Sequence, residues 1–456
     1  MNRLTTSWGE YGLTRFPEDP RDQLRAWDAA DEYLLRHLDG TAGTTSPGTG
    51  TGTGTGADTG AGTDPGAGAA EAGQAVQPVD LGGTVVVLGD RWGALTTTLA
   101  GRVEPGATRL VQITDSFLGQ QATLANLARS GVDGLGSSND ANGSDEANES
   151  EGSDGARSAD GSGGPGAVRL LSTRDAPPER IDVLLVRVPK SLALLEDQLH
   201  RLAPGVHAGT VIVGTGMVTE IHTSTLKLFE RILGRTRTSL AAKKARLIFC
   251  TPDPAIPRVP GPWPHSYALP EDVGTVSGRT VVNHAGIFCA ERLDIGTRFF
   301  LRHLPERRGP ERVVDLGCGN GVVGTAAALA NPEAEVLFVD ESHQAVASAR
   351  ATYRANTDPS THAGAEFRTG DGLAGVPAGS VDLVLNNPPF HTHQATTDAT
   401  SRRMFTGARD ALRPGGELWV IGNRHLGYHV KLRRLFGNCE IVSSDPKFVI
   451  LRAVRT

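Results

Sequence analysis

Residues 313–324 read VVDLGCGNGVVG, an apolar run that ends in three closely spaced glycines and is followed by the small-residue segment TAAALA. The apolar run predicts a buried strand and TAAALA predicts a helix, with Gly317, Gly319 and Gly321 in the turn between them. Glycine permits a tight turn and lets a ligand come close to backbone N–H groups. Such a turn either holds a nucleotide-type cofactor or simply joins a strand to a helix, and its neighbours must decide between the two.

Three further runs predict strands of the same sheet: VLFVD (336–340), EFRTGDG (366–372) and, after a turn, LRPGGELWVIG (412–422). We expect an open α/β sheet, in which ligands bind at the carboxyl ends of the strands. Asp340 ends the first run about 20 residues after the glycines, where a carboxylate can bind both hydroxyls of a ribose. Asp371 ends the second run, at a suitable place to meet the amine of an adenine.

The fourth predicted strand, VDLVLNNPPFH (381–391), carries the most information about function. Two consecutive prolines can neither continue a strand ladder nor enter a helix, so the backbone stops abruptly at the ligand-binding edge. The Asn387 amide and the Pro388 carbonyl can both accept hydrogen bonds from one planar NH2 group, and Phe390 can stack on the ring that carries it. The pattern indicates that an amine or an amide is held here for attack on an electrophile.

These motifs together point to a known family. The series DLGCGNG, VDES, NPPFH and PGGELWVIGNRH resembles the class I S-adenosylmethionine-dependent methyltransferases. Within them it is similar to the ribosomal RNA guanine-N2 methyltransferases, and most of all to those of the large subunit (23S). The likeness extends through LDIGTRFFLRHLPE (293–306) and NRHLGYHVKLRRLFGNC (423–439) to RFPEDP and LRAWDAADEYLL near the amino terminus.

The resemblance implies a cofactor, a reaction and a partner. S-adenosylmethionine is expected along the strand ends, at Asp315, Gly317, Gly319, Gly321, Asp340, Asp371 and Asn387. The expected catalytic residues are Asn387, Pro388, Pro389 and Phe390. Two roles are open for Asp315: it either binds the methionine amine of the cofactor or stabilises the turn through its carboxylate. In the family, the segment before the first strand packs over the cofactor pocket, so Asp294 and Thr297 could approach the methionyl end. The expected partner is large-subunit rRNA that is protein-poor or naked.

The chain also repeats itself. IDVLLVRVPKSL (181–192) aligns with VDLVLNNPPFH at an offset of 200, and TVVVLGDRWGALT (84–96) aligns with the glycine turn. The sequence thus predicts two tandem class I methyltransferase-like (Rossmann-like) α/β domains, a degenerate one over 1–250 and a catalytic one over 281–456, joined by 251–280. Arg187 replaces Asn387 in the first copy. Because arginine can bind phosphate, we expect that copy to bind RNA, or else only to support the fold.

Two low-complexity tracts, 40–78 and 133–165, interrupt the first copy. They are poor in aromatic and branched apolar residues, so we expect them to be disordered. They carry charges of −3 and −7, so the net charge of −6 leaves about +4 on the rest of the chain. That balance permits RNA binding without requiring it.

Composition narrows the class of protein further. The sequence has no apolar signal core, no membrane-length apolar stretch, and four scattered cysteines without metal-type spacing. We expect a cytoplasmic enzyme that uses neither a metal nor a membrane. Two alternatives stay open: methylation of a glutamine N5 amide in a protein, which also uses Asn-Pro-Pro, and a nonenzymatic RNA-binding or assembly protein.

Overall fold

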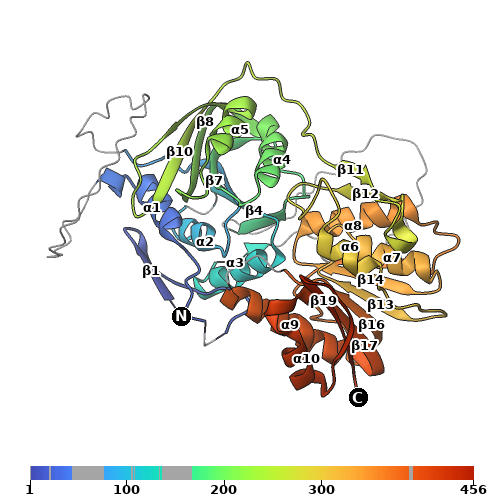
Figure 1. Cartoon of the computed structure of the whole chain (residues 1–456). Coiled ribbons are helices and arrows are strands. Elements are labelled where there is room, and N and C mark those ends of the chain that lie inside the picture. Colours follow the sequence, from blue (N-terminus) through green and yellow to red (C-terminus); the bar gives the residue numbers. More distant parts are fainter. Residues whose placement is uncertain are drawn as a thin grey trace, which may run out of the picture.

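The computed structural model describes residues 2–19, 22–43, 77–103, 106, 108–132, 134–135, 167–389 and 394–456. Most of both low-complexity tracts, for which the sequence predicts disorder, lies outside these residues. The described ends of the tracts are partly regular: Thr41–Gly43 forms a 3-10 turn, and Gly134–Leu135 pairs with a neighbouring strand. Two large sheets with their helices, together with two two-stranded hairpins, make up the described part of the chain (Figure 1).

The carboxyl-terminal half is built on a seven-stranded sheet with the order β15-β14-β13-β16-β17-β19-β18. Its strands are β13 (Arg312–Leu316), β14 (Glu335–Asp340), β15 (Ala365–Thr369), β16 (Val381–Asn386), β17 (Leu412–Asn423), β18 (Glu440–Ser444) and β19 (Phe448–Val454). The first five run parallel, whereas β19 runs antiparallel to both β17 and β18. All five strands predicted from the apolar runs are therefore confirmed, and their carboxyl ends meet at one edge.

Helices cover both faces of this sheet (Figure 1). One apolar core joins one face to α6 (Ile295–Leu301), α7 (Val322–Ala330) and α8 (His343–Asn356). A second core joins the other face to α9 (Gln394–Ala411) and α10 (Tyr428–Phe436). Burial on both faces explains why β13, β14 and β16 read as continuous apolar runs rather than as alternating ones.

The amino-terminal half repeats this plan. Its sheet has the order β5-β6-β4-β3-β7-β8-β10-β9, with β10 antiparallel to β8 and β9. The strands are β3 (Gly83–Leu88), β4 (Thr108–Thr114), β5 (Gly134–Leu135), β6 (Val168–Ser172), β7 (Ile181–Arg187), β8 (Val206–Met217), β9 (Gly234–Thr238) and β10 (Ala245–Pro252). Three helices pack on one face and two on the other: α1 (Ala29–Leu38), α2 (Ala94–Ala100) and α3 (Phe117–Arg129), then α4 (Leu192–Leu202) and α5 (Thr223–Ile232). A hairpin of β1 (Asn2–Thr6) and β2 (Gly9–Leu13) precedes them.

Strand register confirms the internal alignment residue by residue. Val87 pairs with Leu185 in the first sheet, as Asp315 pairs with Leu385 in the second. The register shift that follows the first pair of β7 with β8 recurs between β16 and β17. The two halves are thus copies of one class I methyltransferase-like fold, as the repeat predicts.

The segment between the halves contacts both of them: Arg258 donates to the Ile232 carbonyl of the first half (2.7 Å), whereas the end of the segment packs on the second half. Its hairpin, β11 (His265–Ala268) and β12 (Thr280–Asn283), packs along α8. The Thr352 hydroxyl of α8 accepts a hydrogen bond from the backbone N–H of Val282 (3.0 Å) and donates one to its carbonyl (3.2 Å).

The two halves meet at the loops that follow β4 and β14. The backbone N–H of Phe117 donates to the Glu341 carbonyl (2.8 Å), and that of His343 donates to the Asp115 carbonyl (3.0 Å). These loops occupy equivalent positions in the two copies, so the contact is nearly two-fold symmetric. The first half therefore supports the loop that directly follows Asp340.

Candidate functional site

The glycine turn after β13 has the geometry that the sequence predicts. Gly317, Gly319 and Gly321 have φ angles of 73°, 54° and 74°, in the left-handed region that favours glycine. A Cβ on Gly321 would lie 2.6 Å from the Cα of Ala349, so this glycine lets α7 pack against α8. A Cβ on Gly319 would meet nothing within 4 Å, so this part of the turn faces open space. The space in front of Gly319 can receive a ligand.

Asp340 ends β14 beside this turn. Its carboxylate accepts hydrogen bonds from the backbone N–H groups of Gly319 and Ser342, both at 3.0 Å. Burial raises the pKa of Asp340, and those hydrogen bonds counteract part of the rise. The side chain thus joins the glycine turn to the loop that the first half supports, at the position predicted to bind ribose.

Asp315 is directed into the fold. It is 3% exposed, and its Oδ2 accepts a hydrogen bond from the backbone N–H of Gly324 in the first turn of α7 (2.8 Å). Burial raises its pKa to about 8. This hydrogen bond is the contact expected if Asp315 stabilises the turn.

Asp371 lies just after β15 and is half-buried. Its Oδ1 is 3.6 Å from the Nη2 of Arg403 on α9. The neighbouring glycines, Gly370 and Gly372, face open space as Gly319 does. Arg403 could not be predicted from the sequence, because nothing in the pattern of α9 indicates which of its arginines faces the strand ends.

Asn387 follows β16, and only one of the two polar atoms of its side-chain amide forms a hydrogen bond with a described residue. The Nδ2 donates to the Thr297 hydroxyl on α6 (3.0 Å), whereas the Oδ1 is buried and has no partner among the described residues. The preceding Asn386 is fully buried and donates to the Leu316 carbonyl of β13 (2.7 Å), so it ties two strands together. The Oδ1 of Asn386 also has no partner among the described residues, but Asn386 is fully buried, whereas Asn387 is partly exposed at the end of the strand.

Pro388 and Pro389 continue from Asn387 in non-regular backbone, as predicted. Phe390 lies outside the described residues, as do His391 and His393. The stacking role expected of Phe390 therefore stays a prediction.

The equivalent site of the first copy is filled by charged side chains. Arg187 is fully buried and contacts three carboxylates, those of Asp28 (2.7 Å), Glu220 (2.8 Å) and Asp31 (3.3 Å). Burial alone would raise the pKa of Glu220, but its contacts with Arg187 and a neighbouring arginine hold it at about 2. The expectation that Arg187 contacts phosphate is wrong, because its guanidinium is already neutralised and closed off from solvent.

Three further positions of the first copy differ from the cofactor-site residues of the second copy. Arg91 stands where Gly319 stands in the second copy, and it contacts the same Asp28 and Glu220. Val87 replaces Asp315, and Thr114 replaces Asp340. The first copy therefore lacks both the open glycine turn and the carboxylate at the end of its second strand.

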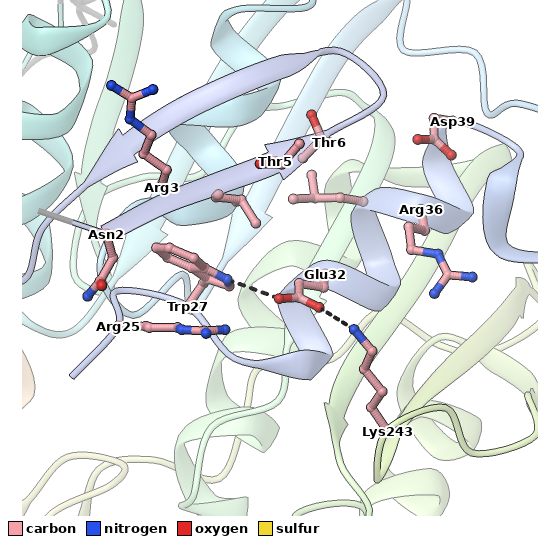
Figure 2. A pocket seen from close by; sticks show the side chains of 12 residues that line it. Asn2, Arg3, Thr5, Thr6, Arg25, Trp27, Glu32, Arg36, Asp39 and Lys243 are labelled. Carbon is pink, nitrogen blue, oxygen red and sulfur yellow. Dashed lines mark hydrogen bonds and ion pairs between the residues drawn. The ribbon is translucent and has the colours of Figure 1, made fainter. Parts of the chain in front are cut away.

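A separate cavity of about 400 Å³ lies between β1 and α1 of the first half (Figure 2). Four basic residues line it: Arg3, Arg25, Arg36 and Lys243. Glu32 accepts from the Trp27 indole (3.1 Å) and pairs with Lys243 (3.1 Å), while Arg3 pairs with Glu10. This cavity is remote from the ends of β13 and β16 (Figure 1), so we do not assign the candidate active site to it.

Within the described part of the chain, no cluster of His, Cys, Asp and Glu is arranged to hold a metal ion. Among the same residues, no helix is both long and apolar enough to cross a membrane.

Family models match both halves of the chain. Residues 278–452 match the Methyltransferase small domain, and residues 1–49, 72–142 and 159–254 match the RLMG N-terminal domain.

Curated relatives match the chain over its whole length. It is 65% identical over 452 residues to a Streptomyces avermitilis protein named Ribosomal RNA large subunit methyltransferase G, with 99% of each chain covered. It is 42% identical over 454 residues to a Pseudomonas paraeruginosa protein of the same name, with 99% of this chain and 100% of the relative covered.

A solved structure shares the two-copy architecture. It is a T. thermophilus 16S rRNA N2 methyltransferase in complex with AdoMet and guanosine. The TM-score is 0.65 at 18% identity, and the match covers 100% of this chain and 98% of that one. At this identity the likeness concerns the fold.

Proposed function

The chain belongs to the ribosomal RNA large subunit methyltransferase G family, and from that membership we propose its reaction. It transfers a methyl group from S-adenosylmethionine to the exocyclic N2 amine of a guanine in large-subunit (23S) rRNA. The observation that carries this proposal is the buried Oδ1 of Asn387, an acceptor that has no partner among the described residues and lies beside the open glycine turn. Transfer of labelled methyl from the cofactor to N2-methylguanosine in rRNA tests it.

The residues at the strand ends fit this cofactor. The open face of Gly319 leaves room for the backbone to approach a ligand, and Asp340 and Asp371 are proposed to bind the ribose hydroxyls and the adenine amine. Asp315 can reach a cationic methionyl amine only in addition to its contact with Gly324. When bound, S-adenosylmethionine supplies an electrophilic methyl group.

The chain's own residues act mainly by positioning the amine. The Asn387 side chain and the Pro388 carbonyl accept from the two N2 hydrogens, and this directs the nitrogen lone pair toward the methyl donor. Phe390 stacks on the guanine, a contact worth about 1–3 kcal/mol by analogy with other aromatic base platforms. A guanine amine loses its proton easily once methylated. Orientation of the amine therefore contributes more to the rate of methyl transfer than a general base does.

The target guanine must leave its stack to reach this site. Extrusion costs a few kcal/mol and is cheapest in a loop or in unfolded RNA, so we propose a protein-poor 23S rRNA in the cytoplasm as substrate. Methylation of a protein glutamine is disfavoured by the family membership and by the duplicated halves.

Asp340→Ala should weaken S-adenosylmethionine binding about tenfold or more, because charged hydrogen bonds contribute roughly 1.5–3 kcal/mol. Calorimetry measures the affinity. Asp358→Ala is a matched control, since Asp358 also accepts from a nearby backbone N–H, that of Ser360, but lies on an exposed loop. Unchanged affinity in Asp340→Ala would remove Asp340 from the cofactor site.

Cofactor affinity should rise as pH increases from about 6 toward 8. Burial raises the pKa of Asp315 to about 8 and also raises that of Asp340. Both a cationic amine and ribose hydroxyls favour the ionised carboxylates, so binding is strongest above these pKa values and weakens as pH falls through them. Calorimetry in buffers with different ionisation enthalpies should detect proton release on binding. Affinity that is flat over this range would contradict the assignment.

A further inference from the structure

The proposed reaction depends on which way the Asn387 amide points. An asparagine side chain has an accepting oxygen and a donating NH2 group of nearly the same shape. Rotation of the amide by half a turn would present NH2 to the substrate amine, placing donor against donor. Some other group must therefore hold the amide in the accepting orientation.

Two residues of the α6 amino terminus provide that constraint. Asp294 is the N-cap, and its Oδ2 accepts from the Thr297 backbone N–H (2.9 Å) and from the Thr297 hydroxyl (3.3 Å). A carboxylate only accepts, so the hydroxyl hydrogen of Thr297 points to Asp294. The Thr297 oxygen is then left as an acceptor, and only the NH2 of Asn387 can face it, at 3.0 Å.

The start of α6 is held firmly in place. Thr297 is 8% exposed, so water does not readily replace its contacts. A Cβ on Gly296 would lie 3.1 Å from the Cε1 of Phe448, which shows how closely the helix packs on β19. The hydrogen-bond series from Asp294 through Thr297 to Asn387 thus rests on packed elements.

We propose that Thr297, oriented by Asp294, is a positioning residue that fixes the Asn387 amide with its oxygen toward the target amine. This inference rests on the proposed function and deepens it. Thr297 acts through Asn387 and need not touch the reacting atoms.

Thr297→Val removes the hydroxyl and keeps the side-chain shape, whereas Thr297→Ser keeps the hydroxyl. Turnover at saturating RNA and cofactor should fall about tenfold in Thr297→Val, comparable to the loss of one hydrogen bond of about 1.4 kcal/mol, and should stay within about twofold in Thr297→Ser. The cofactor affinity of both variants, measured by calorimetry, should match that of the unmodified protein.

Thr325→Val is the matched control. Thr325 is fully buried on α7, and its hydroxyl has no partner among the described residues, so the same substitution there breaks no hydrogen bond. We expect it to leave turnover unchanged.

A double-mutant cycle separates positioning from a structural role. In an Asn387→Ala background, Thr297→Val should cost little further turnover, because there is no amide left to orient. An additive loss would overturn the inference, as would weakened cofactor binding with normal turnover at saturation. A protein that is active but does not methylate guanine N2 would overturn the proposed function and the inference with it.

Discussion

Asn387→Ala is expected to slow methyl transfer about a hundredfold or more, as the loss of one preorganised polar contact at a reacting centre does in other enzymes. The substitution removes the only acceptor of this side chain that no described residue uses, the buried Oδ1. Cofactor affinity should barely change, because the glycine turn and Asp340 are untouched. Single-turnover rates at saturating cofactor and RNA, together with calorimetry, measure both quantities.

Asn356→Ala is the control for that experiment. Asn356 lies in the same half, at the end of α8, and its side chain donates to the Thr280 and Thr352 carbonyls rather than to any group at the strand ends. It should keep normal turnover. Normal turnover in Asn387→Ala as well would show that Asn387 does not align the amine.

Arg187→Ala is expected to destabilise the first half by about 3–5 kcal/mol, because it leaves buried carboxylates without their cation. Asp28, Asp31 and Glu220 all lie within 3.3 Å of the guanidinium. Chemical unfolding followed by fluorescence and circular dichroism would measure the loss.

Lys190→Ala is the matched control at the neighbouring position, since Lys190 is exposed and stands where Phe390 stands in the second copy. Its free energy of unfolding should change by less than about 0.5 kcal/mol. If Arg187→Ala kept full stability while weakening RNA binding and its salt dependence, the buried ion-pair assignment would be wrong and the phosphate reading would be restored.

The sequence was a good guide to the fold wherever local pattern decides structure. The apolar runs of β13, β14 and β16 and the glycines after β13 predict a strand, a turn and a helix without tertiary information. The repeat at an offset of 200 predicted the second sheet, and strand register bears it out. The domain boundaries stay a prediction.

The roles of side chains whose partners lie far away in sequence were harder to predict. Arg187 was expected to contact phosphate, yet its partner Asp28 lies 159 positions away in sequence. The contact between Thr297 and Asn387 spans 90 positions, so the sequence could place Thr297 near the cofactor but could not reveal the hydrogen bond that orients the amide. Such errors arise because an alignment of motifs gives the residue type at each position but not the side chains that surround it in the folded protein.

The central claim is most directly tested by incubating the purified protein with labelled S-adenosylmethionine and unmodified 23S rRNA, then digesting the RNA to nucleosides for mass spectrometry. We predict label in N2-methylguanosine and in no other nucleoside, with the signal lost in Asn387→Ala. Label in a different nucleoside, or in protein glutamine with none in the RNA, would contradict the account.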